Sequence, residues 1–269
     1  MNGYRRYTVL FLAIIAITAL VSLITADDPL TRTRIKYSTL HRLYEKNKPA
    51  IVLIRVAIDA TQGTTTGDEG VAPKKSNIGA GPKPPLYQEH MSADELGTIQ
   101  AFQIGTGFFF DSSGEILTSY HVVGSHKSIF VVLHDSTTYM ADVVGFNEKI
   151  DLALLKIRST NRVVFPHLAL GNSRMTKVAD PIVVIGHPEA LGWTLSTGFI
   201  SALRGNDPIT PPIQLQSMIK PGSSGSPLIN PKDNTVIGII QSVIDDFSFA
   251  IPIQDVKNEL KNLRNQKNK

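Results

Sequence analysis

Residues 220–228 have the sequence Lys220-Pro221-Gly222-Ser223-Ser224-Gly225-Ser226-Pro227-Leu228. This stretch lies between two apolar runs that we expect to be strands, Ile213–Met218 and Thr235–Ile244. Glycines and small residues this close together let backbone amides point into one shared space, as acyl transfer requires around a nucleophilic hydroxyl. Because such clusters also form ordinary turns, the interpretation needs a base, an orienting acid and a suitable fold elsewhere in the chain.

Short strands separated by turns dominate the chain around this stretch. Clusters such as Asp111-Ser112-Ser113-Gly114 and Pro231-Lys232-Asp233-Asn234 separate the apolar runs, with no helical pattern between them. This spacing favours an all-β barrel or sandwich. The expected strands are Ala50–Ile58, Phe102–Phe110, Ile116–Ser119, Ile129–His134, Met140–Phe146, Leu152–Ile157, Pro181–Ile185, Leu195–Leu203, Ile213–Met218, Val236–Ile244 and Phe249–Ile253.

Three other segments frame the strands. Ser38–Lys48 has apolar residues at helical spacing and ends at Pro49, so a short helix is expected there. Gln254–Asn265 has the same periodicity and predicts a closing helix. Residues 59–97 are poor in apolar residues, and because the strand pattern resumes beyond them we expect a mobile loop within one domain.

Composition excludes several classes of protein. The 269 residues are 42% hydrophobic, enough for a sizeable core, and carry a net charge of +4. Having no cysteine, the chain forms no disulfide or thiolate zinc site and has no Cys nucleophile. No H-E-x-x-H motif occurs, so we expect no metal and no cofactor. Basic residues gather at both ends, where we expect solvated termini and no nucleic acid partner.

The N-terminus carries an uncharged apolar run, Thr8–Ala26, preceded by Arg5 and Arg6. The run is longer than the core of a signal peptide and long enough to span a bilayer, so we predict a transmembrane signal anchor. The positive-inside rule then puts the residues after Ala26 outside the cytoplasm. Cleavage after Ala26, which would release a secreted protein, remains the alternative.

A histidine and an aspartate precede the Gly/Ser stretch in an order that suits nucleophilic catalysis. His121 follows the apolar run Ile116–Ser119, and Asp151 leads directly into Leu152–Ile157. A partly buried carboxylate requires a partner that favours its charged form, and an imidazole N–H is a suitable one. Because the three residues occur in the order His121, Asp151, Ser224, a shared catalytic role is better supported than a role for any one of them alone.

These segments resemble those of trypsin-like serine proteases, specifically the HtrA-like (Do/Deg) branch. The resemblance covers about Tyr37 to Val256 and implies two perpendicular six-stranded antiparallel β-barrels with the site in the cleft between them. The matching motifs are Gly105-Thr106-Gly107-Phe108, Thr118–Val123, Asp151–Ile157, Ile185-Gly186-His187-Pro188, Ser196–Ser201 and Phe249–Ile253.

The resemblance also implies roles for individual residues. Ser224 would be the nucleophile, His121 the base and Asp151 the acid that orients it, with the N–H groups of Gly222 and Ser224 forming the oxyanion hole. The primary pocket would be lined by residues before the nucleophile and on the next strand. By position these are Ser217, Met218 and Ile219, then Ile240, Gln241 and Ser242. We predict that four of them line the pocket: Met218, Ile240, Gln241 and Ser242. None is acidic, so cleavage after small or medium apolar residues is expected.

The sequence departs from the family in two places. The family's GNSGGPL is here Gly222-Ser223-Ser224-Gly225-Ser226-Pro227-Leu228, and we expect no PDZ domain after Ile253, where relatives commonly carry one. These departures leave open a catalytically silent, chaperone-like scaffold. An α/β-hydrolase esterase is disfavoured, because that class needs G-x-S-x-G and the order Ser, Asp, His.

We therefore predict a serine endopeptidase acting on protein substrates, namely misfolded or regulatory exported or membrane proteins. By analogy with HtrA-like proteases we also predict a homo-oligomer, a trimer. The expected organisation is a signal anchor at residues 1–26, a linker at 27–37, a protease domain at 38–256 and a basic tail at 257–269.

Overall fold

A computed structural model describes residues 39–59, 99–124, 128–160, 162–205, 212–244 and 247–266. The chain divides into two compact units, residues Met1–Lys46 and Asn47–Lys269. A helix occupies residues 39–47, where the sequence predicts one, and the 3₁₀ turn η1 (Lys48–Ala50), with Pro49 in its first turn, follows directly. The remaining elements belong to the second unit.

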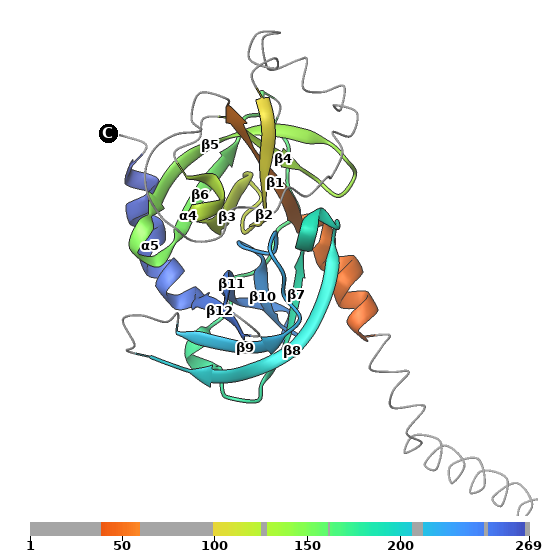
Figure 1. Ribbon diagram of the computed structural model, residues 1–269, viewed down its shortest axis with the longest axis vertical. Helices are drawn as coiled ribbons and strands as arrows, with labels where there is room; N and C mark the ends of the chain where they lie inside the picture. Colours follow the sequence, from red (N-terminus) through yellow and green to blue (C-terminus); the bar gives the residue numbers. More distant parts are fainter. Residues whose placement is uncertain are drawn as a thin grey trace, which may run out of the picture. The chain divides into compact units, whose positions relative to one another are not determined.

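Barrel 1 is a closed antiparallel sheet formed by the first six strands, in the order β1-β2-β3-β6-β5-β4. It is the upper, yellow and green barrel in Figure 1. Its interior is filled by large apolar side chains such as Ile54, Phe109, Ile116 and Leu155. The strands are β1 (Ile51–Asp59), β2 (Ile99–Phe109), β3 (Glu115–Ser119), β4 (Ile129–Val132), β5 (Thr138–Asn147) and β6 (Leu152–Ile157).

Barrel 2 repeats this topology with the last six strands, in the order β7-β8-β9-β12-β11-β10. Its core contains Ile182, Val184, Leu215 and Ile240. The predicted pair of six-stranded antiparallel barrels is therefore confirmed. The strands are β7 (Pro181–Gly186), β8 (Thr194–Leu203), β9 (Ile213–Ser217), β10 (Pro227–Asn230), β11 (Thr235–Ile244) and β12 (Phe247–Pro252).

Within the described ranges, the connections between strands contain only short helical turns. The turn α4 (Tyr120–Val123) follows β3, so His121 lies two residues beyond the end of the predicted strand Ile116–Ser119, in a helix. Of the strands, only β10 was not predicted: four residues directly after a Gly/Ser loop are too short to show alternation. The other turns are η4 (Glu148–Ile150), η5 (Ser173–Met175) and η6 (Pro188–Ala190).

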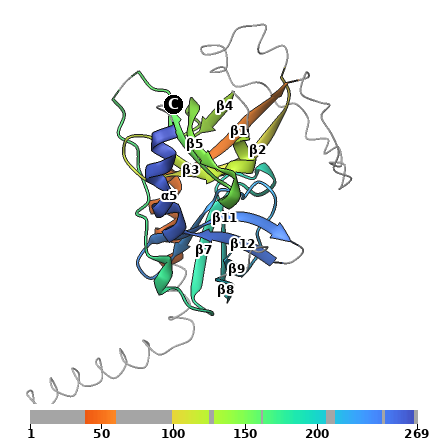
Figure 2. The same cartoon turned by 90° about the vertical axis from the view of Figure 1, so that its left-hand side faces the viewer.

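The closing helix α5 (Ile253–Gln266) continues from β12 of barrel 2 and runs along barrel 1, where it contacts β5 and β6 (Figure 2). A Cβ on Gly145 would lie 2.2 Å from the carbonyl oxygen of Leu263, so only glycine lets the helix approach β5 this closely. Arg264 forms an ion pair with Glu115 at the start of β3. Much of the predicted basic tail, residues 257–266, thus lies in a packed helix.

The predicted anchor, Thr8–Ala26, and most of the predicted mobile loop lie outside the described residues. Within the part of the chain that the structure describes, no helix combines the length and the apolar character needed to cross a bilayer.

Candidate active site

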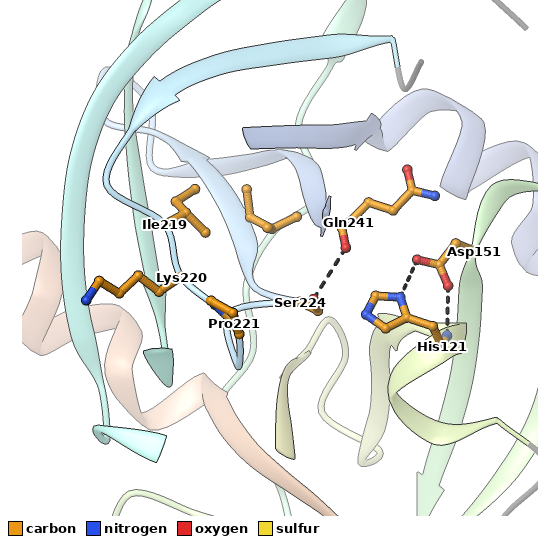
Figure 3. A pocket seen from close by; sticks show the side chains of 8 residues that line it. His121, Asp151, Ile219, Lys220, Pro221, Ser224 and Gln241 are labelled. Carbon is orange, nitrogen blue, oxygen red and sulfur yellow. Dashed lines mark hydrogen bonds and ion pairs between the residues drawn. The ribbon is translucent and has the colours of Figure 1, made fainter. Parts of the chain in front are cut away.

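His121 and Asp151 form a hydrogen-bonded pair on barrel 1. The carboxylate of Asp151 accepts two hydrogen bonds from His121, Oδ1 from the backbone N–H and Oδ2 from Nδ1, each at 2.7 Å (Figure 3). Because an ionised carboxylate can only accept, Nδ1 carries the imidazole proton and Nε2 is left as an acceptor. The ring is thus held in the tautomer that a general base requires.

Backbone contacts fix the segments that carry this pair. Asp151 has a left-handed backbone conformation, with φ of 52°, and its carbonyl accepts a hydrogen bond from the Tyr120 N–H at 3.1 Å. Gln103 Nε2 donates to the His121 carbonyl at 2.8 Å. The side chain of His121 is 49% exposed and that of Asp151 only 14%, so the acid is shielded while the ring faces solvent.

The Ser224 loop (residues 220–226) joins β9 to β10 of barrel 2. Gly222 has φ of +96° and lies so close to His187 that a Cβ would meet the His187 carbonyl oxygen at 2.4 Å, so this position requires glycine. The carbonyl of Pro221 accepts a hydrogen bond from the Glu189 N–H at 2.7 Å. In a trans peptide the N–H points opposite to the C=O, so this bond turns the Gly222 N–H away from Glu189.

The amide of Ser224 is oriented in the same way. The carbonyl of Ser223 accepts a hydrogen bond from the Ser226 N–H at 2.9 Å, which turns the Ser224 N–H to the opposite side. Among the described residues, neither the Gly222 nor the Ser224 amide has an acceptor. The hydroxyl of Ser224 donates to the carbonyl of Gln241 at 3.3 Å, not to His121.

A pocket of about 420 Å³ lies in front of these groups, and it brings His121, Asp151 and Ser224 together. Figure 3 shows the His121 ring between Asp151 and Ser224. The volume suits a side chain of a bound peptide. The lining residues are His121, Asp151, Ile219, Lys220, Pro221, Ser224, Ile240 and Gln241.

Two of the four residues chosen for the primary pocket, Ile240 and Gln241, line it. Met218 lies outside the lining and is 84% exposed, whereas its neighbour Ile219 lines the pocket. The cause is local: β9 ends at Ser217, and the Ile219 N–H donates to the Ser217 carbonyl at 3.0 Å. The resemblance placed Met218 in the pocket by its position before the Ser224 loop, and this turn leaves Met218 exposed while Ile219 lines the pocket.

Ser242 lies on β11, but its side chain is not among those described. Lys220 and Pro221 line the pocket although the sequence analysis assigned them no role there. The side chain of Lys220 is directed away from His121 (Figure 3) and pairs with Glu189, Nζ to Oε1, at 3.4 Å.

Two residues to which the sequence assigned no role, Thr106 and His187, lie against the Ser224 loop. Thr106 donates a hydrogen bond to the Gly222 carbonyl, and the His187 carbonyl lies next to Gly222. Burial lowers the pKa of His187 to about 3, so its ring is neutral at physiological pH.

Within the described ranges no three His, Asp or Glu side chains are arranged to hold a metal ion. That the function requires no metal ion or cofactor stays a prediction.

Comparison with known proteins shows which family this chain resembles. The profile of the family described as "Trypsin-like peptidase domain" matches residues 105–239. A probable periplasmic serine endoprotease, DegP-like, from Hahella chejuensis is 35% identical over 239 residues, covering 81% of this chain and 48% of the relative. Its namesake from Chlamydia pneumoniae is 40% identical over 158 residues, 55% of this chain and 32% of the relative.

A plant relative shares the same region. The chloroplastic protease Do-like 1 of Arabidopsis thaliana is 36% identical over 184 residues, which is 64% of this chain and 41% of that protein. The chain therefore spans between about a third and a half of the length of these curated relatives.

Proposed function

The chain belongs to the family of trypsin-like peptidases, and on that premise we propose that it is a serine endopeptidase of the HtrA-like branch. The observation that carries the proposal is the shared pocket of His121, Asp151 and Ser224, in which Asp151 already fixes the imidazole tautomer. Among the described side chains that line the pocket, no other set supplies a nucleophile, a base and an orienting acid together.

The reaction follows from the positions of these groups. Ser224 Oγ leaves the Gln241 carbonyl, gives its proton to His121 Nε2 and attacks the scissile carbonyl of a peptide. The imidazolium that forms is stabilised by Asp151 and then protonates the leaving amine. Water, activated by the same imidazole, hydrolyses the acyl-enzyme and regenerates the Ser224 hydroxyl.

The N–H groups of Gly222 and Ser224 form the proposed oxyanion hole. Both peptides are already oriented, because their carbonyls are bound by the Glu189 and Ser226 amides on the far side. Donors fixed before the reaction need no reorganisation when negative charge develops on the carbonyl oxygen. This pre-orientation supports turnover without a further change in the loop.

The proposed substrates are proteins cut after small or medium apolar residues such as Val, Ala or Leu. The walls of the pocket include Ile219 and Ile240, and no lining residue other than Asp151 is acidic. Asp151 is engaged by His121, so it is not available to pair with a substrate Lys or Arg. A peptide-library profile dominated by cleavage after Lys or Arg would refute this specificity.

The proposed location is outside the cytoplasm, anchored through Thr8–Ala26. The DegP-like relatives carry the word "periplasmic" in their names, which supports the location, and the apolar run after Arg5 and Arg6 supports the anchor. A C-terminal reporter that is active only in the cytoplasm would contradict the topology. Misfolded or regulatory exported proteins as natural substrates, and a homo-oligomer, remain predictions from family analogy.

One observation favours a second candidate, a catalytically silent scaffold: the Ser224 hydroxyl is bonded to Gln241 and not to His121. Labelling with a fluorophosphonate separates the two. We expect the purified full chain to form a covalent adduct that maps to Ser224 and to be unlabelled as Ser224→Ala. Absence of an adduct on a folded wild-type chain would favour the scaffold, and an adduct on Ser223 would refute the assignment of the nucleophile.

A further inference from the structure

His187 is a buried histidine that the proposed reaction does not use. It follows β7, is 0% exposed, and its ring packs edge-on against Trp193 with centroids 4.8 Å apart. Trp193 in turn donates its indole N–H to the Ile51 carbonyl of barrel 1 at 3.0 Å. Within the described part of the chain the Nε2 of His187 has no hydrogen-bond partner. A buried polar ring of this kind requires a reason beyond packing.

The partner of His187 is Thr106, on β2 of barrel 1. Thr106 Oγ1 lies 3.1 Å from His187 Nδ1 and accepts the backbone N–H of His187, also at 3.1 Å. The same hydroxyl donates to the Gly222 carbonyl at 2.9 Å. The backbone N–H of Thr106 donates to the Ser224 carbonyl, again at 2.9 Å. One residue of barrel 1 therefore holds the carbonyls of both residues proposed for the oxyanion hole.

Counting protons determines the tautomer of His187. A hydroxyl offers one donor and two acceptor positions. The donor of Thr106 is used by Gly222, and one acceptor position is used by the His187 N–H. The contact with Nδ1 can then only be a hydrogen bond from Nδ1–H to the second acceptor position. In the other tautomer Nδ1 would compete with the Gly222 carbonyl for the single hydroxyl proton.

We propose that Thr106 and His187 are a positioning pair for the oxyanion hole: His187, protonated on Nδ1, orients the Thr106 hydroxyl toward the Gly222 carbonyl. The inference rests on the proposed function, because the loop that the pair holds carries the proposed nucleophile. Neither residue is among those that line the pocket, so we assign both a positioning role. They act through the direction of the Gly222–Ser224 backbone.

The kinetic test compares matched variants of the full chain. Thr106→Val keeps the shape of the side chain and removes the hydroxyl, while Thr106→Ser keeps the hydroxyl. We expect Thr106→Val to lower kcat and the rate of fluorophosphonate labelling by about 10- to 100-fold with KM changed less than threefold, since misplacing an oxyanion donor costs less than the roughly 10²–10³ of removing one. Thr106→Ser should recover most of the loss.

The role of His187 is tested by comparing an apolar replacement that packs well with a polar replacement that can donate a hydrogen bond. His187→Leu fills the buried site without a polar group, whereas His187→Asn can return an N–H near the position of Nδ1. We expect the Asn variant to be more active than the Leu variant, and a packing role predicts the opposite. As a control, Ser201→Ala removes a buried hydroxyl near the far end of β8 and should leave kcat unchanged.

The tautomer is tested without any activity measurement. ¹⁵N NMR of the histidine-labelled wild-type chain should identify a neutral His187 protonated on Nδ1. Protonation on Nε2 would overturn the proposal, and this result does not depend on whether any variant folds. If wild type fails to react with the fluorophosphonate, the proposed function fails. If wild type reacts and Thr106→Val reacts equally fast, the positioning pair fails alone.

Discussion

The two barrels have the same strand order, and the same connection in each reaches the site, but the two connections are held in different ways. In barrel 1 the segment after the third strand, α4, carries His121, which is fixed by Asp151 of its own barrel. In barrel 2 the segment after the third strand is the Ser224 loop, which receives two hydrogen bonds from Thr106 of barrel 1. The proposed base is thus positioned by its own barrel, and the proposed nucleophile is positioned by the contact between the barrels.

The largest expected effect comes from removing the nucleophile of barrel 2. Ser224→Ala should lower kcat by about 10⁶ with the fold retained, as loss of the serine does in a protease of related mechanism. Ser223→Ala and Ser226→Gly should keep most of the activity, because neither hydroxyl lines the pocket. Peptide hydrolysis by the three purified variants tests this assignment, and near wild-type turnover by Ser224→Ala would refute it.

The barrel 1 pair should be the next most sensitive point. Asp151→Asn removes the charge that stabilises the imidazolium and favours the wrong tautomer, so kcat should fall by about 10⁴. Asp142→Asn is a matched control, since Asp142 pairs with Arg158 on the surface of the same barrel. Equal activity of the two variants in a peptide assay would mean that His121 does not depend on Asp151.

The Ser224 loop can be disturbed without touching either catalytic side chain. Gly222→Ala introduces a Cβ at a positive φ, 2.4 Å from the His187 carbonyl oxygen, and should lower kcat by about 10²–10³ through loss of one oxyanion donor. Gly192→Ala is the matched control, because nothing lies within 4 Å of its Cβ. Similar kcat values for both variants would show that the loop tolerates the change and that its backbone is not pre-oriented.

The smallest expected effect is on stability, at the contact between barrels. Burial lowers the pKa of His187 to about 3, whereas an unfolded histidine titrates near 6.5. Between these values the unfolded chain binds a proton that the folded chain does not, so the free energy of unfolding falls as pH drops from 6.5 toward 3.

His187→Asn should remove this contribution. Its free energy of unfolding, measured by denaturant titration across that range, should depend less steeply on pH than that of wild type. The difference in slope should be at most about 1.4 kcal/mol per pH unit. Identical slopes would mean that His187 is protonated in the folded chain.

What the sequence predicts well are features with a local signal. Apolar runs bounded by turn residues locate strands such as Leu152–Ile157, found as β6, and the spacing of apolar residues locates α5. Met218 was assigned to the pocket by its position before the Ser224 loop, as the resemblance implies, but a turn follows Ser217. Position along the sequence does not predict this turn, which leaves Met218 exposed while Ile219 lines the pocket.

The pair of Thr106 and His187 has no local signal at all. His187 stands before a proline in what looks like a turn, and Thr106 lies 81 residues away in an unremarkable strand. Only closure of both barrels brings them together, and burial then makes His187 neutral. The resemblance matched both segments to the family by position but carried no information about their contact.

The closing helix α5 has a consequence for how the molecule opens. It continues from barrel 2 and packs on barrel 1, and near its end Gln266 exchanges two hydrogen bonds with the backbone of Phe146, at 2.9 and 3.0 Å. We therefore expect that the two barrels can separate only after α5 has detached from barrel 1. We expect the pair to melt in one cooperative transition, so that thermal stress removes the catalytic cleft and the barrels together and leaves no half-folded chain with a single intact barrel.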